Sequence, residues 1–236
     1  MRVIITRPEE DAGPLRQTLE SLGHEAILQP LMTIAPRHDV TIPNLPWQAV
    51  VATSANGIRA LPDASSLHHL PMLTVGPQSL KAAQDAGFTL AEAHGGDVDG
   101  LAAHVIAARR ASNGPILYLS GADTAGNLQG QLAAAGFDCR RVVLYDAVPA
   151  RDLGAAATAL RQHKADAVLL YSPRSARIWS SLAKAAGLSA EAAAVPSLCL
   201  SRNVAAALPE GCNALVAEKP ENAAMLRLLE ELHRTR

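Results

Sequence analysis

Aromatic residues are scarce in this sequence, and neither charge is in large excess. Phe, Trp and Tyr make up 3% of the 236 residues, and 21 Lys and Arg nearly balance 22 Asp and Glu. The formal net charge is −1 and the isoelectric point is near 6.7. Proteins that bind nucleic acid usually carry a basic surface, and those that hold bases stack them on aromatic rings. General nucleic-acid binding is therefore excluded, and any anion must be held by local groups.

Long apolar runs and paired cysteines are also missing. No run approaches the ~20 residues that cross a membrane, and the apolar stretch before Arg7 is too short for a signal peptide. The three cysteines, Cys139, Cys199 and Cys212, are odd in number and widely spaced, which is typical of incidental thiols rather than of a disulfide or zinc framework. We expect a soluble, cytoplasmic protein without a metal, and a monomer because no coiled coil is apparent.

The common motifs of nucleotide-dependent and metal-dependent enzymes do not occur. The glycine-rich stretch 95–100 does not have the G-x-G-x-x-G spacing, and there is no Walker lysine loop, H-E-x-x-H or G-x-S-x-G. A helix N-cap explains Asp97 more simply than a pair of catalytic carboxylates does. His94 and His104 have no obvious ligand partner, so we expect both to be solvated surface histidines.

The chain does contain an internal repeat. Residues 3–36 align with residues 116–149 without gaps, so that Gly23 matches Gly136 and Pro36 matches Pro149. Each copy reads as a strand, a turn, an amphipathic helix, a glycine and a second strand. The glycine stands where a helix favours a left-handed cap.

Two further pairs of segments match, residues 49–59 with 167–177 and residues 73–79 with 198–204. Such a long period indicates a duplicated domain rather than a repeat array. Short, wholly apolar strands that alternate with helices are typical of parallel sheets covered on both faces. The sequence therefore predicts two similar α/β domains of the Rossmann or flavodoxin type.

The domain boundaries follow from two extended, proline-containing segments, residues 28–36 and 142–150. Their prolines suit edge strands, and we interpret the segments as a two-stranded connector. Domain 1 then comprises residues 1–34 and 150–236, and domain 2 comprises residues 38–140. A cut near residues 112–115 would instead give two consecutive domains.

Six turns between a strand and a helix, three in each half of the chain, carry small polar residues. Ligands of open α/β sheets bind at the carboxyl ends of strands, where helix N-termini expose N–H groups to anions. For a single turn, an ordinary N-cap is the simpler explanation, contributing about 1 kcal/mol. Six such turns around one interdomain cleft would suit a polyanion. They are Thr6-Arg7-Pro8, Thr53-Ser54-Ala55-Asn56, Val75-Gly76-Pro77-Gln78, Ser120-Gly121-Ala122-Asp123, Ser172-Pro173-Arg174-Ser175 and Ser201-Arg202-Asn203.

Five stretches in this order resemble uroporphyrinogen-III synthase: residues 5–8, 53–57, 75–76, 143–145 and 200–205. The chain departs from the family at Leu119-Ser120-Gly121, where an arginine-glycine pair is frequent, and at Glu221, where a threonine is frequent. The resemblance implies two α/β domains with a two-stranded connector. It also implies a cytoplasmic, cofactor-free enzyme that dehydrates and cyclises hydroxymethylbilane, handed over by hydroxymethylbilane synthase, and inverts its last pyrrole ring. The product, uroporphyrinogen III, leads to tetrapyrroles such as haem, cobalamin and chlorophyll.

A carboxylate-rich substrate of this kind fits the six turns, and Arg7, Arg174 and Arg202 could add charge-assisted hydrogen bonds. Tyr145 is the expected catalytic acid, because a protonated phenol can donate to the leaving hydroxyl and the resemblance points to it. Packing alone would also explain Tyr145, and Tyr171 is a weaker candidate. The alternative is a non-enzymatic, two-lobed module that binds a small anion. The expected substrate-binding residues are Arg7, Thr53, Ser54, Asn56, Gly76, Ser120, Gly121, Ser172, Arg174, Ser201, Arg202 and Asn203.

Overall fold

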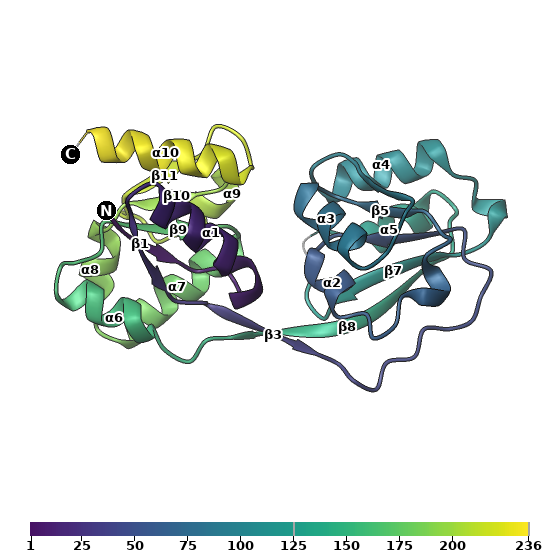
Figure 1. The fold of residues 1–236 in the computed structure, drawn as a ribbon, viewed down its shortest axis with the longest axis horizontal. Helices are drawn as coiled ribbons and strands as arrows, with labels where there is room; N and C mark the ends of the chain where they lie inside the picture. The colour runs from purple at the N-terminus through teal and green to yellow at the C-terminus, as the bar shows by residue number, and fades with distance from the viewer. Residues whose placement is uncertain (125, 236) are drawn as a thin grey trace. The chain divides into compact units, whose positions relative to one another are not determined.

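A computed structural model describes residues 1–124 and 126–235 of the chain (Figure 1). The chain divides into two compact units. Unit 1 consists of Met1–Thr33 and Val148–Arg236, and unit 2 consists of Ile34–Ala147. Unit 1 therefore combines the purple beginning of the ribbon with its green and yellow end.

The sheet of unit 1 has five strands in the order β11-β10-β9-β1-β2, and each neighbouring pair is parallel. Strand β9, at the centre of the sheet, is completely apolar, as expected where helices cover both faces of a parallel sheet. The strands are β1 (Arg2–Ile5), β2 (Glu25–Leu28), β9 (Ala167–Leu170), β10 (Ser197–Cys199) and β11 (Ala214–Val216).

Helices cover the two faces of this sheet around separate cores. Val3 and Ile5 point to the face covered by α1 and α10, whereas Ile4 points to the opposite face and packs in the cluster around Trp179. Figure 1 shows α10 and α7 on opposite sides of the sheet. The helices are α1 (Glu9–Ser21), α6 (Gly154–Arg161), α7 (Pro173–Ala185), α8 (Ser189–Ala194), α9 (Arg202–Ala205) and α10 (Asn222–Arg234).

The sheet of unit 2 has the order β3-β8-β7-β4-β5-β6, and the pairs from β8 to β6 are parallel. Its strands are β3 (Met32–Pro36), β4 (Ala49–Ala52), β5 (Met72–Thr74), β6 (Ala91–Ala93), β7 (Ile116–Gly121) and β8 (Cys139–Pro149). Its α-helices are α2 (Ala55–Arg59), α3 (Pro77–Asp85), α4 (Val98–Ala108) and α5 (Leu128–Ala134), with 3-10 turns η1 (Ser65–Leu67) and η2 (Ala111–Asn113). Helices α2 and α3 cover one face, and α4 and α5 cover the other.

Strands β3 and β8 pair with each other, and the boundary between the units falls within both. The Arg37 amide donates to the Leu144 carbonyl at 2.8 Å, and the Ala150 amide donates to the Leu31 carbonyl at 2.9 Å. One residue number rises as the other falls, so the two strands are antiparallel. Arg37 also holds Asp146 through two hydrogen bonds of 2.7 and 2.8 Å, and this guanidinium lowers the pKa of the Asp146 carboxyl.

The repeated glycines adopt the conformation predicted for them. Gly23 has φ +80° and Gly136 has φ +87°. The amide that follows each glycine reaches back over the helix end, from His24 to the Leu19 carbonyl at 2.9 Å and from Phe137 to the Leu132 carbonyl at 3.0 Å. The predicted left-handed caps are confirmed, and so is the α/β fold class with parallel sheets.

The cysteines are free thiols, as the sequence predicted. Cys139 and Cys199 are buried, and burial raises the pKa of the first to about 12 and of the second to about 11. In the described part of the chain, every helix is too short or too polar to span a membrane.

Candidate functional site

The six turns lie at the carboxyl ends of parallel strands in both units. In unit 1 they follow β1, β9 and β10, and in unit 2 they follow β4, β5 and β7. The turn at Thr6 therefore belongs with those at Ser172 and Ser201, although it comes from the first half of the sequence. Within each unit the three turns share one edge of the sheet, because their strands run in the same direction.

The turn after β1 uses its threonine for structure. The Thr6 hydroxyl is buried and donates to the Leu169 carbonyl at 2.6 Å, which joins β1 to β9. Arg7 lies over the Tyr171 ring, 4.5 Å from its centroid, and its guanidinium pairs with Asp11 at 3.5 Å. Arg7 is thus held at the sheet edge by an aromatic face and a carboxylate.

The turn after β9 is a capping box. The Ser175 amide donates to the Ser172 hydroxyl at 3.0 Å, and the Ser172 amide donates to the Ser175 hydroxyl at 3.1 Å. Pro173 occupies the first helical position, where no amide is needed. The Ser172 side chain is therefore committed to starting α7, a helix of 13 residues. The partly buried Arg174 side chain lies in the first turn of this helix.

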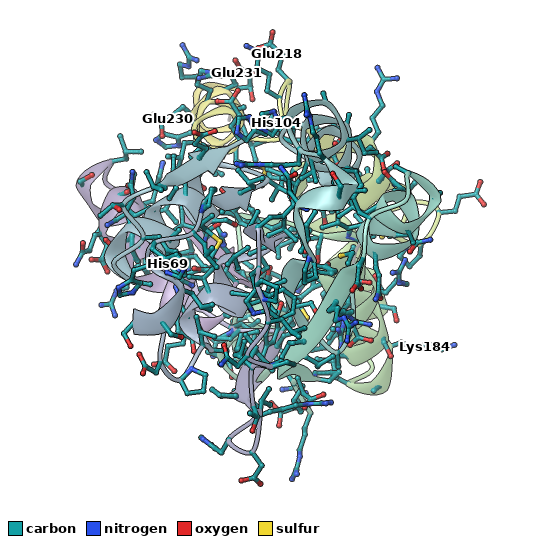
Figure 2. The ribbon with its side chains drawn as sticks, turned by 90° about the vertical axis from the view of Figure 1, so that its right-hand side faces the viewer. His69, His104, Lys184, Glu218, Glu230 and Glu231 are labelled. Carbon is teal, nitrogen blue, oxygen red and sulfur yellow. The ribbon has the colours of Figure 1, made fainter. Side chains whose placement is uncertain are left out.

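The turn after β10 lines a cavity of about 410 Å³. Ser201 is the N-cap residue of α9, but its hydroxyl forms no capping hydrogen bond. Arg202 also lines the cavity, and Asn203 follows it on the exposed side of α9. The remaining lining residues are Leu200, Val216, Ala217, Glu218 and Pro220, of which Glu218 is labelled in Figure 2. A hydroxyl and a guanidinium in one cavity can bind an oxyanion.

The turn after β4 uses both of its hydroxyls within unit 2. The Thr53 hydroxyl lies 3.0 Å from the Tyr118 hydroxyl, and the Ser54 hydroxyl accepts from the Asn56 amide at 3.2 Å. The Asn56 side chain accepts from the Arg59 guanidinium at 3.2 Å. The N-cap explanation thus holds for Ser54, which begins α2.

In the turn after β5, the group available to a ligand is the backbone, because the N-cap residue is a glycine. Gly76 is the N-cap of α3 and has an extended conformation, with φ −170° and ψ 177°. A Cβ atom at this position would have no neighbour within 4 Å in the described residues. The backbone at Gly76 therefore lies beside open space at the start of a nine-residue helix.

The turn after β7 is held by an arginine that sequence reasoning missed. Arg141 lies on β8, where it pairs with Tyr118 of β7. Its Nε atom donates to the buried Ser120 hydroxyl at 2.8 Å. Its Nη2 atom donates to the carbonyls of Gly121 and Ala122, both at 2.6 Å. The Ser120 hydroxyl is thereby occupied, and the turn is fixed in place. No sequence motif marks this contact, and predicting it would have required knowledge of how β7 pairs with β8.

Tyr145 lies against the end of the same turn because the pairing of β7 with β8 is irregular. Ser120 pairs with Val143, but Gly121 pairs with Tyr145, so that Leu144 is skipped. Such a bulge changes the direction of the side chains that follow it. A Cβ atom on Gly121 would lie 2.5 Å from Cζ of Tyr145 and 2.9 Å from its hydroxyl oxygen. Only glycine leaves room for the phenol.

The three tyrosines differ in what their hydroxyls contact. The Tyr118 hydroxyl contacts Thr53, and the Tyr171 hydroxyl donates to Asn222 at 2.9 Å. Burial raises the pKa of Tyr118, and it raises the pKa of Tyr171 to about 12 against the opposing effect of Arg7. Tyr145 is 7% exposed, and no described residue forms a hydrogen bond with its hydroxyl. Tyr145 is therefore the tyrosine whose phenol is not committed to the fold.

Fold and turns define a class of protein: a two-unit α/β protein whose strand ends carry backbone amides, arginines and one uncommitted phenol. A family model described as "Uroporphyrinogen-III synthase HemD" matches residues 13–227. The chain belongs to the uroporphyrinogen-III synthase family. Membership of this family makes it an enzyme of tetrapyrrole biosynthesis that acts on a small molecule. A comparison with curated proteins finds no match.

Solved structures of the same family share the fold. The uroporphyrinogen-III synthetase of Helicobacter pylori aligns with a TM-score of 0.69 at 17% identity, over 98% of this chain and all of that chain. A mutant uroporphyrinogen III synthase of Thermus thermophilus aligns with a TM-score of 0.59 at 18% identity, over the full length of both chains. At 17–18% identity, these two alignments show that the fold is shared and carry no information about individual residues.

Proposed function

We propose that the chain is a uroporphyrinogen-III synthase that acts as a hydro-lyase on hydroxymethylbilane. It removes water from the substrate and closes the macrocycle with its last pyrrole ring inverted. We further propose that it works as a monomer in the cytoplasm, on substrate delivered by hydroxymethylbilane synthase. Family membership supports the reaction, and no comparison favours the small-anion binding module.

The substrate carboxylates are bound at the strand ends of both units. Where a side chain is already used, as at Thr53, Ser54 and Ser120, the turn contributes backbone N–H groups. At Ser172 the capping box uses the amides of Ser172 and Ser175, and the turn contributes the positive end of the α7 dipole. Where a side chain faces a cavity, as at Ser201 and Arg202, it binds the carboxylate directly. Arg7, Arg174 and Asn203 extend the set in unit 1, and Asn56, Gly76 and Gly121 extend it in unit 2.

Tyr145 is the acid in this proposal. Its phenol donates a hydrogen bond to the hydroxyl of the hydroxymethyl group. The C–O bond then breaks, and water leaves with the proton. The electrophilic carbon that remains is attacked by the substituted carbon of the last pyrrole ring, which the turns hold close to it. The bond from that ring carbon to its original methylene bridge then breaks, and the released methylene carbon bonds to the unsubstituted carbon of the same ring. The proton lost from that carbon returns to the Tyr145 oxygen. Positioning of two reacting atoms can by itself provide about 7–11 kcal/mol of barrier reduction.

The observation that carries the assignment of Tyr145 is its uncommitted hydroxyl beside the glycine of the β7 turn. The other two tyrosines use their hydroxyls inside the fold. The Tyr145 ring packs in the core of unit 2, but its hydroxyl forms no hydrogen bond with a described residue and is suited to donate to a substrate.

The test is the isomer that forms from hydroxymethylbilane. The protein of residues 1–236 is added to freshly generated hydroxymethylbilane, and the oxidised porphyrins are separated by chromatography. We expect isomer III to replace the isomer I that forms without enzyme. Heat-denatured protein serves as the control. If folded protein, checked by circular dichroism, leaves isomer I as the product, the proposed function is wrong.

A further inference from the structure

Glu92, His94 and His104 come together at one edge of unit 2, which corrects the prediction of solvated, unpartnered histidines. Glu92 lies on β6, the edge strand of the sheet, and His94 lies two residues further on the same face. His104 is on α4 and is labelled in Figure 2. One possible ligand atom from each of the three residues lies within 4.8 Å of the other two.

The positions of the three side chains are set by the backbone. The His94 amide donates to the Thr74 carbonyl at 2.8 Å, which extends the ladder between β5 and β6. The Asp97 side chain accepts from the Gly100 amide at 2.8 Å and begins α4. Asp99 accepts from the Gln131 side chain at 2.7 Å. These two carboxylates are therefore in use, whereas Glu92 faces the histidines.

The cluster brings together the donor types of a metal site with two imidazoles and a carboxylate. Nε2 of His94 lies 2.9 Å from Oε2 of Glu92, and the rings of His94 and His104 are stacked with centroids 3.3 Å apart. Ligands at 2.0–2.1 Å from a tetrahedral zinc ion are about 3.4 Å from one another. The three donors lie within 4.8 Å of one another, so movements of about 1–2 Å bring them to ligand spacing.

One adjustment is required before an ion can bind. The imidazole planes of His94 and His104 are inclined to each other by only 8°. The nitrogen lone pairs lie in these planes, so those of one ring do not converge with those of the other. One ring must tilt for two nitrogens to converge on one ion. The site is open enough for this movement, because the side chain of His94 is 24% exposed and that of Glu92 is 61% exposed.

We propose that Glu92, His94 and His104 bind a divalent first-row transition-metal ion, zinc in the first place, with water completing its coordination. Such a donor set suits zinc, and an ion held by β6 and α4 would fasten the edge strand to the helix that covers it. The proposal concerns stability rather than the proposed reaction, because none of the three donors is among the residues proposed to bind substrate, although β6 lies beside β5, which leads to the Gly76 turn.

The experiment is a zinc titration of the protein of residues 1–236 after removal of metal with a chelator, monitored by competition with a chromophoric chelator. We expect one equivalent to bind. His94→Ala and His104→Ala should each weaken binding at least tenfold, and Glu92→Gln should weaken it severalfold. Because Glu92 is an exposed side chain, its variant keeps the test valid if a histidine variant does not fold.

Two controls separate this site from other donors. His69→Ala removes an exposed histidine outside the cluster, and Cys212→Ser removes the most accessible thiol. Both should bind zinc like the unmodified chain. Bound Co²⁺ should show tetrahedral absorption without a thiolate band. Equal affinity in Glu92→Gln, His104→Ala and the unmodified chain, or binding that is lost with Cys212, would overturn the proposal.

Discussion

At the scale of single residues, the chain divides its polar side chains between the fold and the proposed substrate. Thr6, Thr53 and Ser172 all resemble ligand-binding residues in the sequence, yet each hydroxyl has a partner inside its own unit. The Ser201 hydroxyl has no capping role, and the Tyr145 hydroxyl has no hydrogen bond with a described residue. The sequence already singles out Tyr145 as the expected acid, whereas it gives no reason to separate Ser201 from the other turn hydroxyls.

Tyr145→Phe tests the proposed acid. The variant keeps the ring that packs against Gly121 and loses only the hydroxyl, so the fold should be retained. We expect the kcat for isomer III formation to fall about 10²-fold or more, because general acid catalysis contributes about that much, while KM changes little. Initial rates from hydroxymethylbilane at several concentrations provide both constants.

Tyr171→Phe is the matched control. It removes the hydrogen bond to Asn222 but keeps the ring beneath Arg7, and a hydrogen bond of this kind contributes about 1 kcal/mol to stability. We expect nearly full activity from this variant. Equal kcat values for the two variants and the unmodified chain would remove Tyr145 as the acid.

How far the sequence predicts the site depends on whether a contact is local. The caps at Ser54, Ser172 and Asp97 follow from residues two or three positions away, and a sequence shows them directly. The contact of Arg141 with Ser120 joins two strands, and the stacking of His94 on His104 joins a strand to a helix. Such contacts depend on strand pairing and helix position, which no short motif encodes.

At the scale of elements, the internal repeat predicts much of the fold. The first strand and helix of each copy and their glycine caps recur as β1 with α1 and β7 with α5, because apolar spacing and a glycine are local signals. The same alignment does not predict the irregular pairing of β7 with β8. That irregularity places Tyr145 opposite Gly121, and it results from packing between two strands.

Gly121→Ala tests whether this irregularity positions the phenol. The added methyl group would lie 2.5 Å from the Tyr145 ring, so the ring must move, and overpacking of this kind costs about 1–3 kcal/mol. We expect a lower kcat together with a lower midpoint of urea unfolding. The combined Gly121→Ala and Tyr145→Phe variant should be little slower than the slower single variant, because both changes act on the same phenol.

Gly13→Ala is the matched control for this glycine. It lies within α1, and a Cβ atom there would have no neighbour within 4 Å. Alanine in a helix interior is more stable than glycine by about 0.5–1 kcal/mol. We therefore expect a small gain in stability and unchanged activity. Full activity in Gly121→Ala would contradict the positioning role of Gly121.

At the scale of the whole molecule, both units bury a thiol. Cys139 lies on β8 in unit 2, and Cys199 lies on β10 in unit 1. Burial raises the pKa of Cys139 to about 12 and that of Cys199 to about 11, because a thiolate loses its hydration in an apolar environment. In an unfolded chain the pKa of a cysteine is about 8.5. The two units should therefore respond to alkaline pH in the same direction.

Between pH 8.5 and 11, the folded chain keeps thiol protons that the unfolded chain loses, so the free energy of unfolding falls as the pH rises. We expect a loss on the order of 2 kcal/mol for each buried thiol at pH 10 relative to pH 7. This loss is measured by urea unfolding at pH 7 and pH 10, for the unmodified chain and for the Cys139→Ala/Cys199→Ala variant. Each protein is compared with itself at the two pH values, so any change in stability that the alanine substitutions cause at both pH values cancels. If both proteins lose the same free energy between pH 7 and pH 10, the buried thiols do not control the alkaline stability.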